Sequence, residues 1–305
     1  MNEISWIWMP VVLFAALAQT VRNAAQRSLI AELGTLPATL ARFLFGLPFA
    51  LVYLLALYAL FAGIHVMPKF SLTYFGWIAV GAAFQIAATA ALLLAMKGRN
   101  FAVAVTLSKT EVLQVALFAS IFLHELPTAL SLLAMVLATV GVLILSLPAS
   151  GSRASLAAWA SRSAMYGLLC GACFAIASVG FRGAALELQE SSPWLSGAWG
   201  VLWAQTFQSI CLGAWVTVRN PGGLRPLFKA WRVSLLAGSM GAAASLAWFT
   251  AYAMQGAAEV RTLGMVEVVF SYLVSRRLFR EPMRRSEKVG MWLMLLGLVL
   301  VCTSL

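Results

Sequence analysis

Two glutamates, Glu111 and Glu267, lie deep inside long apolar segments of the chain. A charged side chain at the centre of a bilayer costs about 2.5–3.5 kcal/mol on insertion scales, so acids kept there usually serve a function. Side chains of this type could bind a cationic group or carry a proton. They could also form a structural ion pair, or a hydrogen bond, that closes an interface between helices.

Lys109 precedes Glu111 by two positions. Two residues this far apart on a continuous helix point to different faces, so these two side chains should not meet. We therefore expect Lys109 to pair with Glu267 across an interface, or else to attract a substrate carboxylate or phosphate. In the first case the other acid is left for substrate or proton.

Polar side chains also recur at helical spacing, which puts them on one helix face. These stripes consist of Gln19, Arg22, Asn23 and Gln26 near the N-terminus, and of Gly241, Ser245, Trp248, Tyr252 and Gln255 later in the chain. Gln85 occupies a related position in another apolar segment. A polar stripe on a membrane helix needs water or protein opposite it, which favours either a cavity or interhelical hydrogen bonds.

The aromatic members of the second stripe have two interpretations. Trp248 and Tyr252 could stack on an aromatic or cationic substrate through their ring faces. They could equally be ordinary packing residues. With Gln19 and Gln85, they complete the predicted binding residues around Lys109, Glu111 and Glu267.

The segments that position these residues are those of a membrane protein. The 305 residues are 62% hydrophobic and 10% charged, whereas soluble chains are about 25% charged. Crossing a bilayer takes about 20 apolar residues per helix. We predict an all-α membrane protein with ten transmembrane helices, at 4–30, 37–62, 70–96, 101–123, 128–148, 162–187, 194–218, 230–254, 257–279 and 288–304. Soluble enzymes, disordered tails and disulfide-rich secreted domains are excluded.

The two halves of the sequence repeat each other. A shift of 156 positions superimposes Glu111 on Glu267, Glu125 on Glu281 and Gly141 on Gly297. Each half holds five predicted helices, an odd number, so the second copy enters the membrane in the opposite orientation. We expect two inverted five-helix repeats, residues 1–150 and 151–305, with a substrate site near the midplane between them.

Basic residues are unevenly distributed between the predicted loops. Alternate loops and the adjoining helix ends hold 17 Lys and Arg, whereas the opposite side holds only Lys69, Arg182 and Arg261. The positive-inside rule places loops 1–2, 3–4, 5–6, 7–8 and 9–10 in the cytoplasm and both termini outside. The net charge of +11 is thus assigned to topology and not to nucleic-acid binding.

Several motifs resemble the drug/metabolite transporter (DMT) superfamily, specifically its EamA-type members with ten helices. They are Leu36-Pro37-Ala38-Thr39-Leu40-Ala41-Arg42-Phe43, the turn Leu123-His124-Glu125-Leu126-Pro127 followed by Gly141, and its second copy Arg280-Glu281-Pro282 followed by Gly297. The sequence departs from the family at Lys109-Thr110-Glu111 and Val266-Glu267, where a proline is frequent. Family members are usually drawn with both termini in the cytoplasm, opposite to the charge count.

The resemblance implies a secondary transporter of small organic metabolites in a bacterial cytoplasmic (inner) membrane, and proton-coupled export by alternating access. Two acids favour cationic or zwitterionic solutes, such as amino acids or amines. A passive channel and a lipid or headgroup flippase of the same fold are the alternatives. We expect small-molecule, lipid and proton partners, a monomer or homodimer, and no enzymatic activity, cofactor, metal or nucleic acid. Cys170 and Cys173 form a CxxC without a second ligand pair, so they are assigned to helix packing.

Overall fold

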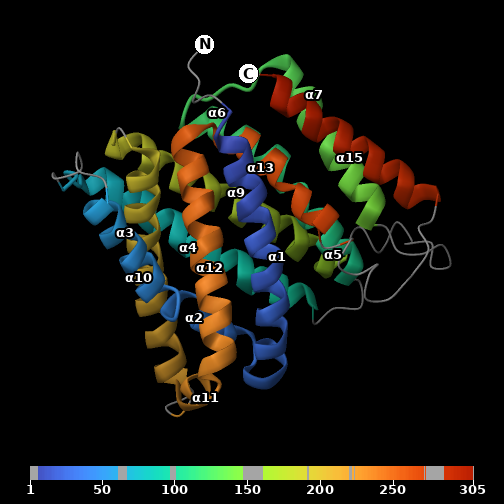
Figure 1. Cartoon of the computed structure of the whole chain (residues 1–305). Helices are drawn as coiled ribbons and strands as arrows, with labels where there is room; N and C mark the ends of the chain where they lie inside the picture. The colour runs from blue at the N-terminus through green and yellow to red at the C-terminus, as the bar shows by residue number, and fades with distance from the viewer. Residues whose placement is uncertain are drawn as a thin grey trace. The chain divides into compact units, whose positions relative to one another are not determined.

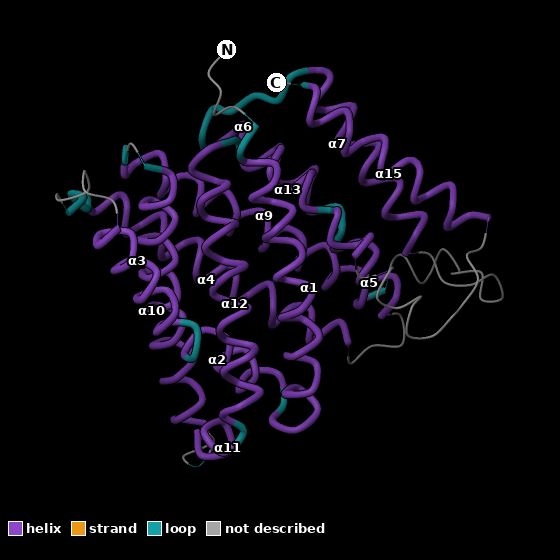
Figure 2. Tube along the Cα trace, viewed as in Figure 1, coloured by secondary structure: helices purple, strands orange, loops and turns teal. Residues whose placement is uncertain are grey.

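The computed structural model describes residues 6–60, 67–96, 101–146, 161–190, 192–219, 222, 224–270, 272 and 285–304. These residues form helices joined by turns, and no strand occurs among them (Figure 2). In a bilayer, backbone N–H and C=O groups must find partners within the chain, so long apolar segments fold as helices. The all-α class predicted from the sequence is confirmed.

The chain divides into two compact units. Unit 1 consists of Met1–Ala83 and Gly180–Gln255, and unit 2 of Phe84–Val179 and Gly256–Leu305. Unit 1 contains α1 (Trp8–Leu33), α2 (Thr35–Leu44), α3 (Leu47–Leu60), the beginning of α4 (Leu72–Met96), the end of α9 (Arg162–Leu188), α10 (Pro193–Arg219), α11 (Leu224–Lys229) and α12 (Trp231–Met254).

Within unit 1, α1 lies along α12, and α2 and α3 pack on α10 and α12 (Figure 1). Small residues permit this approach, because a Cβ on Gly238 would lie 2.6 Å from the carbonyl carbon of Phe45. Gly197 similarly faces the backbone of Thr250. The predicted helix 37–62 is divided into α2 and α3, since Pro48 has no N–H to donate to the carbonyl four residues earlier.

Unit 2 contains the remainder of α4 and α9, together with α5 (Phe101–Ser108), α6 (Glu111–Phe122), α7 (Ala129–Ser146), α13 (Ala257–Gly264) and α15 (Arg285–Thr303). Here α7 and α15 run side by side (Figure 1). Their glycines are in contact with the opposite backbone: a Cβ on Gly297 would lie 2.6 Å from Ala138 N, and one on Gly141 would overlap Met294.

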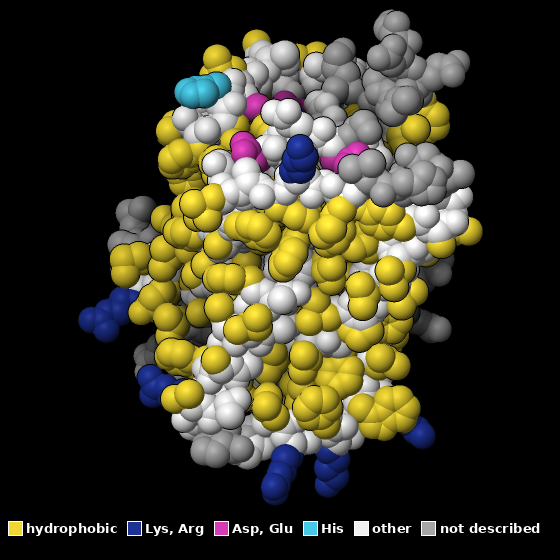
Figure 3. Space-filling view, turned by 90° about the vertical axis from the view of Figure 1, so that its left-hand side faces the viewer, with side chains coloured by type: hydrophobic (Ala, Val, Ile, Leu, Met, Phe, Trp, Pro, Cys, Tyr) yellow, Lys and Arg dark blue, Asp and Glu magenta, His cyan; other side chains and the backbone are white. Residues whose placement is uncertain are grey.

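Eight helices among the described residues are long and apolar enough to cross a membrane. They are Thr35–Leu60 (α2 and α3 counted together), Leu72–Leu92, Val103–Phe122 (α5 and α6 counted together), Ala129–Ser146, Arg162–Leu188, Pro193–Arg219, Trp231–Met254 and Arg285–Thr303. On the face drawn in Figure 3, hydrophobic side chains form a broad band, and Lys and Arg side chains project at its lower end. An apolar surface of this extent is suited to contact with lipid.

Two other predicted segments overlap observed helices. Segment 4–30 corresponds to the 26-residue α1, and segment 257–279 begins with α13. The second acidic turn, Arg280-Glu281-Pro282, and the polar stretch 148–160 fall outside the described residues. The first acidic turn is described, and its His124 has a positive φ of 56°.

Candidate functional site

The helix that carries Glu111 is broken directly before this residue. Helix α5 ends at Ser108, Lys109 and Thr110 form a turn, and α6 begins at Glu111. The Lys109 N–H donates to Thr106 O at 3.1 Å, a bond to the third residue back that tightens the helix locally. The predicted continuous helix over 101–123 is therefore two helices, and Lys109 and Glu111 are not confined to different faces of one helix.

A second break occurs at the related position of unit 2. Helix α13 ends at Gly264, Met265 is a turn residue, and helical structure resumes at 266, one residue before Glu267. The Met265 N–H donates to Thr262 O at 3.0 Å. Met265 and Thr262 each lie 156 positions after Lys109 and Thr106, so both breaks have the same hydrogen bond at related residues.

The two breaks bring four charged side chains of unit 2 into two ion pairs. Lys109 Nζ lies 3.2 Å from Glu267 Oε1, and Arg261 NH2 lies 2.5 Å from Glu111 Oε1. The side chains of Glu111 and Arg261 are 11% and 18% exposed, and those of Glu267 and Lys109 are 19% and 31% exposed. The cluster is therefore electrically neutral and largely, but not completely, shielded.

The expected pairing of Lys109 with Glu267 is confirmed. The expectation that the other acid is left over is wrong, because Arg261 pairs with Glu111. Charge counting had assigned Arg261 to an external loop, whereas it lies inside α13. Its place among apolar neighbours, six residues before Glu267, was the signal in the sequence that could have identified it as an intramembrane charge.

Helix α9 passes directly over the first break. A Cβ on Gly171 would lie 3.0 Å from Ser108 O and 3.1 Å from Gln114 Nε2, and one on Gly167 would overlap the backbone of Ala104. These glycines allow α9 to pack closely against α5 and α6. Cys170 and Cys173 are free thiols buried in the same helix. Among the described residues, no three His, Cys, Asp or Glu side chains form a group that could hold a metal ion.

Three further predicted site residues meet in unit 1. Trp248 Nε1 donates a hydrogen bond of 3.0 Å to Gln19 Oε1, which joins α12 to α1. The rings of Trp248 and Tyr252 stack with centroids 6.3 Å apart. Gln85 belongs to unit 2, where its backbone oxygen accepts a bond from Thr89. Lys109, Glu111 and Glu267 thus form one group in unit 2, and Gln19, Trp248 and Tyr252 form another in unit 1.

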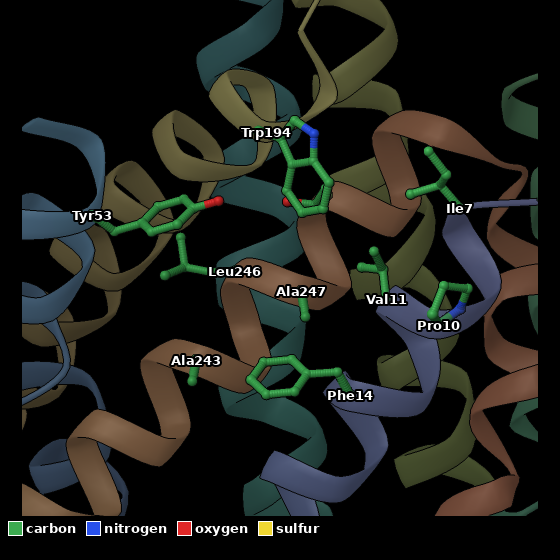
Figure 4. Close-up of a pocket in the computed structure, with 10 residues that line it drawn as sticks. Ile7, Pro10, Val11, Phe14, Tyr53, Trp194, Ala243, Leu246 and Ala247 are labelled. Atoms are coloured by element: carbon green, nitrogen blue, oxygen red, sulfur yellow. The ribbon is translucent and has the colours of Figure 1, made fainter. Parts of the chain in front are cut away.

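Unit 1 also contains an apolar pocket of about 570 Å³ (Figure 4). Aliphatic and aromatic side chains line it, mainly from α1 and α12, with Tyr53 of α3 and Trp194 of α10; they include Ile7, Val11, Phe14, Leu246 and Ala247. The pocket was not predicted, because most of its lining residues are apolar and do not differ in sequence from lipid-facing ones. On α12 it uses the face with Ala243, Leu246 and Ala247, beside the face that bears Trp248 and Tyr252.

Apolar helices with ionised side chains placed among them define an integral membrane protein with buried charges, the arrangement of solute pathways. Residues 161–303 match the model of the EamA-like transporter family, which belongs to the DMT superfamily. This confirms the resemblance predicted from the sequence over the second half of the chain.

A solved structure has a similar fold. One crystal structure of a protein covers 97% of this chain and 96% of its own, with a TM-score of 0.72 and 14% sequence identity. At this identity the similarity concerns the fold alone. No curated protein matches the sequence.

Proposed function

We propose that the protein is a secondary active transporter that exports small organic metabolites in exchange for protons. Cationic or zwitterionic solutes, such as amino acids or amines, are the favoured substrates. Transport would proceed by alternating access around a central cavity at the midplane, between two inverted five-helix repeats formed by residues 1–150 and 151–305. The predicted binding residues are Glu111, Glu267, Lys109, Gln19, Gln85, Trp248 and Tyr252.

The helix breaks support the repeat. Met265 lies 156 positions after Lys109, and the N–H of each donates to the carbonyl three residues earlier, Thr262 O and Thr106 O. The contacts are reciprocal as well: Gly141 faces Met294, and Gly297 faces Ala138. Gly297 and Met294 lie 156 positions after Gly141 and Ala138. Reciprocal contacts between positions 156 apart are expected if a local two-fold axis relates α7 to α15.

The two ion pairs at the broken helices carry the proposal. Broken helices expose backbone dipoles and charges at membrane depth, and transporters use them to bind ions and substrates. In this site each carboxylate already has a cationic partner, Lys109 or Arg261. A substrate ammonium or a proton can replace that partner at the carboxylate. Replacement frees a buried cation and changes the stability of the cluster, which couples binding to a conformational change.

A double variant tests the acidic core. We expect Glu111→Gln/Glu267→Gln to abolish pH-gradient-driven movement of radiolabelled amino acids or amines in proteoliposomes, because neutral amides bind neither protons nor cations strongly. Glu32→Gln, which changes an exposed glutamate of α1, is the matched control and should transport normally. Wild-type transport by the double variant would refute the proposed role of both acids.

The orientation is part of the proposal. With the basic loops in the cytoplasm of a bacterial inner membrane, both termini are external. Cysteines introduced at Lys229 and at Lys69 would then react with an impermeant maleimide from opposite sides of right-side-out vesicles. Reaction of Lys229→Cys from outside would show the reverse orientation.

The apolar pocket of unit 1 favours a second candidate, a flippase for lipids or lipid headgroups. A pocket of about 570 Å³ lined by aliphatic and aromatic side chains is suited to an acyl chain or another apolar group. Dithionite quenching of fluorescent lipids in proteoliposomes distinguishes this activity from solute transport. Saturable counterflow distinguishes both from a passive channel.

A further inference from the structure

Arg42 is a buried arginine inside a membrane-spanning segment of unit 1. Only 9% of this residue is exposed, and its Nε atom has no hydrogen-bond partner among the described residues. The guanidinium carbon lies 4.3 Å from the centre of the Phe43 ring. No carboxylate in the described part of the chain forms an ion pair with it. A guanidinium stays charged in proteins and carries five N–H donors, so this burial needs an acceptor.

A second arginine approaches the same point. A Cβ on Gly241 of α12 would lie 2.8 Å from Arg42 Cγ and 3.4 Å from Arg22 Cδ. Both side chains therefore pass over one glycine, where α1, α2 and α12 pack together (Figure 1). Asn23 Oδ1 accepts hydrogen bonds from Arg22 Nε and NH2, at 3.3 and 2.7 Å. Like charges held close together repel each other, and a bound anion would reduce that repulsion.

A buried amide adjoins this pair. Gln205 of α10 is 2% exposed, and its Oε1 atom has no hydrogen-bond partner among the described residues. A Cβ on Gly46 would lie 2.8 Å from Arg42 O and 2.9 Å from Gln205 Oε1. The amide thus borders the turn that follows Arg42, between α2 and α3. An amide oxygen accepts hydrogen bonds, so a water or a hydroxyl group, and not an ionised oxygen, would complete it.

We propose that Arg22 and Arg42 form a binding site for an oxyanion, a carboxylate or phosphate group, within unit 1. Planar guanidinium groups match such anions with two parallel hydrogen bonds, which a single ammonium group cannot make. The group could belong to a solute or to a lipid headgroup. The proposal deepens the proposed function by giving the substrate an acidic group, but the binding step can be measured without transport.

The test uses the purified full-length chain in a neutral detergent, titrated with inorganic phosphate or acetate against chloride at constant ionic strength. Intrinsic tryptophan fluorescence and the thermal unfolding midpoint report binding. We expect saturable binding of at least one of the two anions, weakened at least tenfold by Arg42→Gln and by Arg22→Gln. Arg219→Gln removes an exposed arginine of the same unit and should bind like the wild type. Unchanged binding by Arg42→Gln, or no saturable binding by the wild type, would overturn the proposal.

Two milder variants guard against misfolding. Arg42→Lys keeps the charge but loses the planar fork, so it should fold and bind more weakly than the wild type. Gly241→Ala places a methyl group against Arg42 Cγ and should also weaken binding, whereas Gly213→Ala has open space and should not. Wild-type affinity in both Arg42→Lys and Gly241→Ala would contradict a site built from these side chains.

Nanodiscs identify the source of the anion. If phosphatidylglycerol, but not phosphatidylcholine, abolishes phosphate binding, the site holds a lipid phosphate; if binding persists in both, it holds a soluble solute. The transport test changes Glu111 and Glu267 of unit 2, whereas the anion titration changes Arg22 and Arg42 of unit 1. Failure of the acidic-core hypothesis and failure of this one therefore give different results.

Discussion

Lys109 and Glu267 are 158 positions apart in the chain, yet the Lys109 ammonium lies 3.2 Å from the Glu267 carboxylate. In the second ion pair, Arg261 with Glu111, the cation comes from the later of the same two regions and the acid from the earlier one. Each half of the sequence thus supplies one cation and one acid. The two broken helices of unit 2 are held together by reciprocal charges, which makes the cluster sensitive to any change of protonation or ligand.

Replacing one partner of an ion pair should destabilise the protein more than replacing both partners together. We expect Lys109→Met or Glu267→Gln alone to lower the free energy of unfolding by about 1–3 kcal/mol, below the cost for fully buried pairs because both side chains are partly exposed. The double variant should lose less than the sum of the single variants. Reversible unfolding in mixed micelles gives the free energies of unfolding of the wild type, the two single variants and the double variant. Strictly additive losses would show that the pair contributes no coupling energy.

The contact of α7 with α15 should not tolerate side chains at its glycines. Gly297→Ala would force a methyl group against the backbone of Ala134 and Ala138, and we expect a loss of about 1–3 kcal/mol, as for other overpacked sites. Gly76→Ala and Gly213→Ala are matched controls, since nothing lies within 4 Å of the added Cβ. These should be neutral or slightly stabilising, because alanine favours helices over glycine. Thermal unfolding compares the three, and equal midpoints would contradict the close packing.

Filling the apolar pocket of unit 1 should abolish its ability to bind apolar molecules. Ala247 lines the pocket and is 7% exposed, so Ala247→Trp would place an indole within the cavity of about 570 Å³. Leu236→Trp, at a position of the same helix that is 49% exposed, is the control. Fluorescence of a neutral naphthalene dye in detergent solution should increase with the wild type and the control only. Equal dye binding by Ala247→Trp would exclude the pocket as the binding place.

The hydrogen bond between Trp248 and Gln19 should stabilise the contact of α12 with α1. Gln19→Leu removes the acceptor of the indole N–H, which we expect to cost about 1 kcal/mol. Thr217→Val is a control, since the Thr217 hydroxyl bonds only within its own exposed helix. Near-ultraviolet circular dichroism should change in Gln19→Leu alone. An unchanged spectrum and unfolding midpoint would show that this bond is dispensable.

Helix positions were the most predictable part of the fold. An apolar run long enough to cross a bilayer leaves the backbone no alternative to a helix, so most of the predicted segments coincide with observed helices. The division of segment 37–62 at Phe45–Gly46 could also have been predicted, because Pro48 was visible in the sequence. The break at Lys109–Thr110 could not, since neither residue prevents a helix and the turn depends on how α9 packs over it through Gly171.

The sequence by itself determined that this is an α-helical membrane protein, that its acids recur 156 positions apart, and that Lys109 had Glu267 as one of two candidate partners. These conclusions rest on the energetic cost of exposing polar groups to lipid, which applies to any fold. Only the tertiary structure decided that Arg261 pairs with Glu111 and that the side chains of Arg22 and Arg42 both pack on one glycine of α12. It also placed an apolar pocket beside the predicted polar face of α12. Such pairings depend on distances between helices, and hydrophobic periodicity specifies which face of a helix is buried without specifying which neighbour covers it.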